Sequence, residues 1–188
     1  QGGDGFMKKK FLRLCVVLLL LLLITNVATA DTVDDYKKGV DALNKGDYVE
    51  ATQWFHKAAE KGMAEAQSQL GFMYLKGEGV PQDYLEGERW LRKAAEQEYA
   101  LAQYVLGMMY CYGEGVAQDF EEAARWFFKA AKQGLVEAQY NLGVMYCDGE
   151  GVPQDFKEAA RWFFKAAKQG YSEAQYNLGV MYCDGQGV

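Results

Sequence analysis

A unit of 36 residues recurs through most of this chain and limits what it can fold into. Tryptophan stands at the same place in four successive units, at Trp54, Trp90, Trp126 and Trp162. The heptapeptide GEGVPQD occurs at residues 77–83 and 149–155, and GEGVAQD occurs between them at 113–119. A period of roughly 20–50 residues is typical of stacked supersecondary units. We therefore expect an elongated array with an extended surface rather than one deep core.

The first 30 residues differ from the repeats and have the features of a secretory leader. After a short extension before Met7 comes a basic cluster, and an uninterrupted apolar run covers residues 14–24. The small residues Ala28 and Ala30 then form an A-x-A site. These three features are typical of a cleavable signal peptide. A membrane anchor is the alternative, but a spanning helix needs about 20 apolar residues. We expect cleavage after Ala30, no stable membrane span afterwards, and a periplasmic or secreted location.

The charge of the chain argues against nucleic acid as a partner. The whole chain has a net charge of −6, and because the first 30 residues carry +3, the remainder carries −9. No long run of Lys or Arg occurs after Arg13. Since phosphate binding requires clustered basic residues, we expect protein or peptide partners and no nucleic acid.

Cysteine occurs once per unit in the later repeats, at Cys111, Cys147 and Cys183. Equivalent positions on stacked helices lie about 8–10 Å apart. A disulfide requires Cα atoms within about 7 Å. We therefore expect free, half-buried thiols, and a redox-sensing role for this row is one alternative function.

Residues 136–171 predict a helix, a loop and a second helix. In the first half, apolar residues recur at helical spacing around Gly143, which predicts close approach of another helix where a Cβ would collide. Asp155 and Glu158 have the spacing of a capping box at the start of the second helix. A glycine ends that helix in most units, but Glu98 stands there in the second unit, residues 64–99. That helix end is expected to be strained or extended.

The two end units depart from the pattern. Residues 31–63 have Lys45-Gly46-Asp47 in place of the long loop, which is typical of an N-terminal capping unit. Residues 172–188 stop after a loop and before the helix that should follow. We expect a fragment of a longer array, and an uncapped last helix is compatible with self-association.

The recurring pattern AxxxLGxMYxxGxGVxQDxxEAxxWFxKAAxxG closely resembles the Sel-1-like repeat, a relative of the tetratricopeptide repeat. The leading unit, with its GDY turn, looks closer to a plain tetratricopeptide unit. The resemblance implies an all-α, right-handed superhelical solenoid of antiparallel helix pairs. It places repeats within 64–188, at 64–99, 100–135, 136–171 and, in part, 172–188. It also implies a scaffold or adaptor in protein complexes, and similar bacterial proteins are often exported.

The resemblance further implies where a partner binds, since the first helix of each tetratricopeptide pair lines the concave face. The positions that carry over are Ser68, Phe72, Tyr104, Met108, Tyr112, Tyr140, Val144, Asp148, Tyr176, Val180 and Asp184. Tyrosine ladders suit peptide recognition because each ring combines apolar area with a polar tip. Packing between units is the other interpretation of the same rings.

Catalytic and cofactor chemistry receive little support from the residues. A cysteine-rich branch of the family has been described as binding or hydrolysing β-lactams, so a secreted hydrolase of that kind is the alternative function. That branch has paired cysteines within repeats, which this chain lacks, and neither Ser68 nor Ser172 begins a Ser-x-x-Lys motif. His56 is the only histidine, and no C-x-x-C or H-E-x-x-H occurs. We expect no enzymatic activity, no cofactor and no bound metal.

Overall fold

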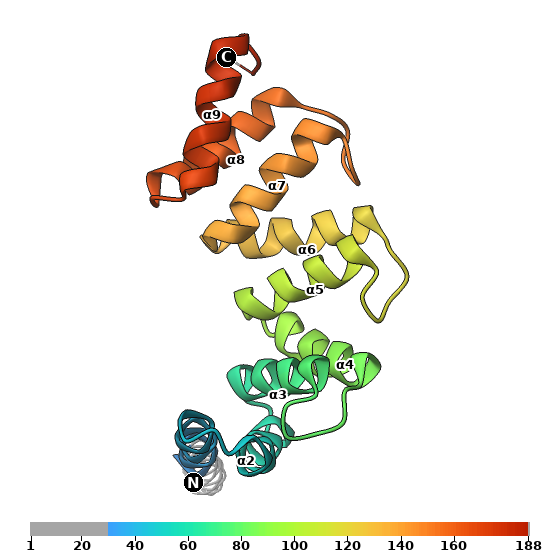
Figure 1. The fold of residues 1–188 in the computed structure, drawn as a ribbon, viewed down its shortest axis with the longest axis vertical. Coiled ribbons are helices and arrows are strands. Elements are labelled where there is room, and N and C mark those ends of the chain that lie inside the picture. The colour runs from blue at the N-terminus through green and yellow to red at the C-terminus, as the bar shows by residue number, and fades with distance from the viewer. Residues whose placement is uncertain (1–29, 188) are drawn as a thin grey trace, which may run out of the picture.

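The computed structural model describes residues 30–187, and each regular element in that range is an α-helix. Residues 30–44 form the N-terminal helix. The following helices are α2 (Tyr48–Glu60), α3 (Ala64–Lys76), α4 (Tyr84–Glu96), α5 (Ala100–Tyr112), α6 (Phe120–Lys132), α7 (Val136–Asp148), α8 (Phe156–Lys168) and α9 (Ser172–Asp184). They stack in chain order into an elongated, twisted array with the two ends at opposite poles (Figure 1). The predicted all-α solenoid is confirmed. The predicted leader lies outside the described residues.

The hydrophobic core is distributed along the array. Each helix packs mainly against its neighbours in sequence, most extensively within the pairs α3–α4, α5–α6 and α7–α8. One cluster joins Phe127 of α6, Leu142 and Met145 of α7, and Trp162 of α8. Because such clusters bridge consecutive units, each unit completes the core of the one before it.

A glycine in the first helix of each complete pair lets the second helix approach closely. Gly143 on α7 faces the buried ring of Phe163 on α8, and a Cβ there would lie 2.7 Å from Phe163 Cδ1. Gly107 meets Phe127 in the same way, with 2.6 Å to the nearest ring carbon. Carbon atoms pack best at about 3.5–4.0 Å, so a methyl group does not fit at either glycine. The predicted close approach is confirmed, and its partner is the aromatic ring of the same unit.

An aspartate caps the start of each second helix, as the sequence predicts. Asp155 Oδ1 accepts hydrogen bonds from the backbone N–H groups of Lys157 at 2.9 Å and Glu158 at 3.1 Å. The backbone N–H of Asp155 donates to the carbonyl oxygen of Tyr146 at 2.8 Å. In a complete capping box, the Glu158 carboxylate would accept a hydrogen bond from this N–H. Because the N–H is already bonded to Tyr146, that second hydrogen bond does not form. The Glu158 carboxylate forms an ion pair with Arg161 at 2.5 Å instead.

Buried glutamines connect consecutive units. Gln139 Nε2 on α7 donates to the carbonyl oxygen of Ala131 in the last turn of α6, at 3.2 Å. Gln139 Oε1 in turn accepts from Gln169 Nε2, just after α8, at 2.9 Å. Gln103 makes the same pair of contacts one unit earlier. Each of these side chains satisfies a helix-terminal carbonyl and links three successive helices, a role that the repeat pattern did not suggest.

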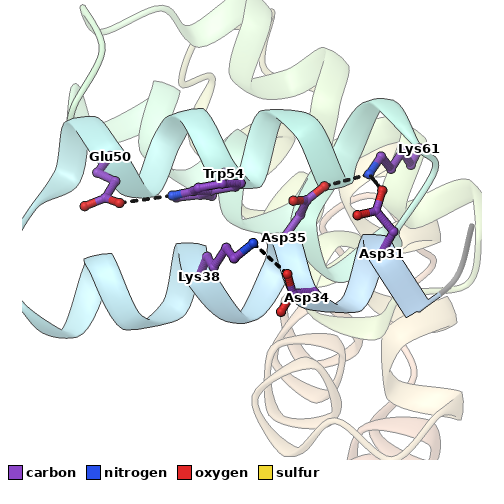
Figure 2. Close-up of polar contacts among 7 residues, drawn as sticks. All are labelled: Asp31, Asp34, Asp35, Lys38, Glu50, Trp54 and Lys61. Carbon is purple, nitrogen blue, oxygen red and sulfur yellow. Dashed lines mark hydrogen bonds and ion pairs between the residues drawn. The ribbon is translucent and has the colours of Figure 1, made fainter.

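Polar contacts hold the N-terminal helix against α2 (Figure 2). Lys61, just after α2, donates to the buried Asp35 at 2.6 Å and also bonds Asp31. The Lys61 hydrogen bond and charge hold the pKa of the Asp31 carboxyl below its ordinary value. Lys38 bonds Asp34 at 2.6 Å and places its ammonium group 4.7 Å from the centre of the Trp54 ring. The short turn predicted at residues 45–47 separates the two helices.

Glu98 adopts the left-handed backbone conformation that glycine adopts in the other units. Its φ is +62°, and it is the one non-glycine residue with positive φ in the described part of the chain. The equivalent Gly134 and Gly170 have φ of +96° and +89°. Helix α4 still ends at Glu96, so this helix end is strained rather than extended.

The Gly143 contact predicts that replacement of glycine by alanine has opposite effects on stability at Gly143 and at the equivalent Gly179. Gly143→Ala should lower the free energy of unfolding by about 1–2 kcal/mol, because the new methyl group overlaps the buried Phe163 ring. Gly179→Ala should raise it by about 0.5–1 kcal/mol, because a Cβ at Gly179 meets nothing within 4 Å and alanine favours a helix. Urea unfolding followed by circular dichroism measures both. Equal losses in the two variants would contradict the proposed role of close approach.

Strain at Glu98 predicts a stabilising substitution. Glu98→Gly should raise the free energy of unfolding by about 0.5–1 kcal/mol, since relief of the left-handed conformation outweighs the added freedom of the unfolded chain. The reciprocal variant Gly134→Glu introduces the same strain one unit later and should lose about 1–2 kcal/mol. Thermal and urea unfolding provide the measurement, and a less stable Glu98→Gly variant would refute the assignment of strain.

Candidate protein-binding surfaces

The structure divides the predicted concave-face residues into a packed group and an exposed group. Ser68 is only 1% exposed and belongs to the core, so its side chain is not available to a partner. The rings of Tyr104 and Tyr140 are half-buried and lie 5.8 Å and 5.7 Å from those of Phe127 and Phe163, measured between centroids. Burial raises the pKa of the Tyr104 hydroxyl above its ordinary value. These two tyrosines pack between helices and leave only part of each ring accessible.

Three further members of the predicted set are also partly buried between units. Phe72, Met108 and Val144 each pack against a core cluster while remaining half-exposed. The Sδ atom of Met108 accepts a hydrogen bond from Asn141 Nδ2 at 3.4 Å, which ties α5 to α7. A partner that reaches these side chains would contact groups already fixed by packing.

The remaining members are exposed, and we refer to them as the first-helix face: Tyr112, Asp148, Tyr176, Val180 and Asp184. Tyr112 and Tyr176 are 64% and 72% exposed. Helices α7 and α9 carry four acidic side chains and no basic one. This face therefore combines exposed tyrosine rings with negative charge.

A lysine lies over the tryptophan ring in every second helix. The Nζ atoms of Lys93 and Lys165 lie 3.9 Å and 3.7 Å from the ring centres of Trp90 and Trp162, three residues earlier in each case. Lys57 on Trp54 and Lys129 on Trp126 repeat this cation–π contact. The i, i+3 spacing on a helix brings the two groups together, so the WFxKAA part of the motif builds its outer surface as well as its core.

A crevice recurs where a second helix meets the next unit. Between α6, α7 and the loop at 149–155 it has a volume of 260 Å³ and is lined in part by Phe128, Leu142 and Tyr146. One unit later a crevice of 600 Å³ is lined in part by Phe164 and Tyr182. Phe128 and Phe164 are 42% and 50% exposed, although their neighbours Phe127 and Phe163 are buried. The two phenylalanines of WFFK are adjacent in the sequence, but they point to different sides of the helix. One ring therefore belongs to the core and the other to the surface.

The three cysteines of the repeats are free, as predicted. Cys111 and Cys147 are half-buried, whereas Cys183 is exposed, since no described helix packs beyond α9. Burial is the main cause that raises the pKa of the Cys111 and Cys147 thiols, with Glu150 and Asp148, respectively, adding to it. A raised pKa lowers the thiolate fraction at neutral pH, so Cys111 and Cys147 are poorly suited to a redox role.

His56 makes packing and polar contacts with neighbouring side chains. Its ring packs edge-on against Trp90 with 5.6 Å between centroids, and its Nδ1 lies 3.5 Å from Glu60. Within residues 30–187, no three His, Cys, Asp or Glu side chains are grouped so that they could hold a metal ion. Over the same residues, no helix is both long enough and apolar enough to cross a membrane.

The helix pairs and their motif define a repeat family. The family model described as the Sel1 repeat matches residues 36–63, 64–99, 100–135, 136–171 and 172–188. This chain belongs to the Sel1 repeat family. Proteins of this family are generally non-enzymatic scaffolds, and their repeats mediate protein–protein interactions. No curated protein matches the chain.

Three solved structures show how far the likeness extends. The chain is 38% identical to c5321, a protective antigen present in uropathogenic Escherichia coli strains, with a TM-score of 0.82 over 85% of this chain and 35% of that one. It is 34% identical to a Sel1 repeat protein from Oxalobacter formigenes, with a TM-score of 0.76 over 84% and 66%. Helicobacter pylori cysteine rich protein B is 26% identical, with a TM-score of 0.54 over 68% and 96%. The chain thus spans about a third of the first relative and just under two thirds of the second.

Burial predicts unequal reactivity of the three thiols. At pH 8, Cys183 should react with iodoacetamide roughly tenfold faster than Cys111 or Cys147, because its side chain is exposed and theirs have raised pKa values. Mass spectrometry of the alkylated peptides follows each cysteine separately, and the urea-unfolded protein serves as the control in which all three should react alike. Equal rates in the folded protein would contradict this ranking.

Proposed function

We propose that this chain is an exported scaffold that binds protein partners through the concave face formed by the first helices of its pairs. The observation that carries the proposal is the first-helix face, where Tyr112, Asp148 and Asp184 occupy the same position in successive units. Tyrosine offers a large contact area at low entropic cost and is enriched at interface hot spots. The acidic members favour a basic or neutral partner.

The leader-like segment that ends at Ala30 supports export to the periplasm or beyond the cell. Similarity to a protective antigen of uropathogenic Escherichia coli agrees with a location that antibodies reach. Cleavage after Ala30 would leave Asp31 at the start of the mature chain, where an acidic side chain stabilises a helix N-terminus. Asp31 would also keep its contact with Lys61, so the mature chain retains the ties between its first helix and α2.

A single expression experiment tests both parts of the proposal. The full chain is produced with its leader in a bacterial host, and intact mass spectrometry of the periplasmic and culture fractions should find a form that begins at Asp31. The same fractions are cross-linked and purified by a C-terminal tag. The double variant Tyr112→Ala/Tyr176→Ala should retain about tenfold less of any bound protein, because two exposed anchor rings are removed.

The matched control is Tyr48→Ala/Tyr84→Ala, which removes two exposed tyrosines from second helices. Partner capture should be unchanged in this control, and circular dichroism should be unchanged in both variants. Equal capture by the first-helix variant and the wild type would move the binding site off the first-helix face. An unprocessed chain confined to the cytoplasm would refute export independently of binding.

A further inference from the structure

The second helices present a separate surface in the later units. Phe128 on α6 and Phe164 on α8 stand at equivalent positions and are both substantially exposed. The earlier units have His56 and Arg92 at this position. The change from a polar to an aromatic side chain therefore occurs on two adjacent units, at the place where the crevices open.

In the unit at residues 64–99, the side chain at this position is Arg92, and it makes polar contacts within the chain. Arg92 donates to the hydroxyl oxygen of Tyr110 at 2.6 Å, and its Nε donates to Glu88 at 2.8 Å. Phe128 cannot donate to the corresponding Tyr146, and Ala124 replaces the glutamate. The aromatic ring instead lines a crevice of 260 Å³ together with Leu142. Phe164 repeats the arrangement in the adjoining crevice of 600 Å³.

Charge on these helices is opposite to that of the rest of the chain. Helices α6 and α8 carry seven basic and three acidic side chains, whereas α7 and α9 carry four acidic and none that is basic. Within the crevices the charges balance, because Glu121 accompanies Arg125 in the first, and Asp155 and Glu158 accompany Lys157 and Arg161 in the second. The positive charge lies beside the exposed rings, where Lys132 Nζ is 5.5 Å from the ring centre of Phe128 and Lys168 Nζ is 5.7 Å from that of Phe164. Since the whole chain has a net charge of −6, this layer is a local positive field on an acidic molecule.

We propose that the outer surface of α6 and α8 binds an acidic segment of a partner protein, whose aromatic or aliphatic side chains enter the two crevices. The carboxylates of that segment pair with the exposed Lys132 and Lys168, and its apolar side chains pack on Phe128 and Phe164. This surface goes beyond the proposed function, because it lies on the second helices and takes the opposite charge to the first-helix face.

A protein segment fits this surface better than a lipid membrane does. The crevices lie between helices and each is lined by an exposed aromatic ring, which suits separate anchor residues rather than a flat sheet of headgroups. The remaining surface is strongly acidic and would be repelled by an anionic bilayer. Ion pairs with the lysines beside the two rings would guide an acidic segment into register with them.

The test selects ligands without assuming a sequence. Phage that display random peptides of about 16 residues, long enough to span two units, are selected on the immobilised protein. The enriched peptides should be rich in Asp and Glu and contain aromatic or aliphatic anchors. Their affinities are then measured by fluorescence anisotropy at about 0.05 M and about 0.5 M salt, and the higher salt should weaken binding.

Three variants assign the bound peptides to a surface. Phe128→His/Phe164→His copies the residue already present at His56 and should weaken binding about tenfold. Lys132→Gln/Lys168→Gln should weaken binding and reduce its salt dependence. The first-helix variant Tyr112→Ala/Tyr176→Ala is the matched control and should bind the peptides normally. The result for the surface of α6 and α8 is therefore independent of whether the first-helix face binds a partner.

Several outcomes would overturn the proposal. These are the absence of enriched peptides, enriched peptides that lack acidic residues, and full affinity in the folded Phe128→His/Phe164→His variant. Co-sedimentation of the protein with phosphatidylglycerol vesicles that this variant abolishes would assign the surface to a membrane. A dimer in analytical ultracentrifugation that the same variant dissociates would assign it to a second copy of the chain.

Discussion

The whole stack depends on one contact that is made inside each complete helix pair. A side chain of the second helix rests directly on a glycine of the first: Phe127 on Gly107, Phe163 on Gly143, and Leu91 on Gly71. Without a Cβ, the two helices can approach closely enough for the large side chain to be fully buried. This contact sets the geometry of one unit, and repetition of the unit every 36 residues carries the same geometry along the array.

Contacts between units then turn a row of helix pairs into one continuous body. Gln103 and Gln139 bond both the preceding and the following second helix, and tryptophans such as Trp162 complete the core of the previous unit. Because polar and apolar groups recur in register, the surface is also periodic. When one position of the motif changes in several units, the surface changes along a row of equivalent residues. Phe128 and Phe164, at the position of the polar His56 and Arg92, are an example.

Most of the local structure could be predicted from the residues. The helix–loop–helix unit, the aspartate caps, the short turn at 45–47 and the irregular helix end at Glu98 each follow from chemistry within a few residues of the position concerned. The candidate site was less predictable. Ser68 shares the helix position of the tyrosines and is predicted to lie on a binding face, yet it is buried. The exposed ring of Phe128 is not among the predicted site residues. The exposure of both side chains depends on how neighbouring units pack.

The amino-acid sequence is enough to derive the repeat family, the helix pairs, the helix boundaries set by Asp and Gly, and the acidity of the chain, because these depend on local propensity and on spacing along the backbone. Only the folded structure shows which members of each row are exposed and which glutamines bridge three helices. Those properties depend on how consecutive units pack, because the residues in contact, such as Gln103 and Gln133, lie 30 positions apart in the chain.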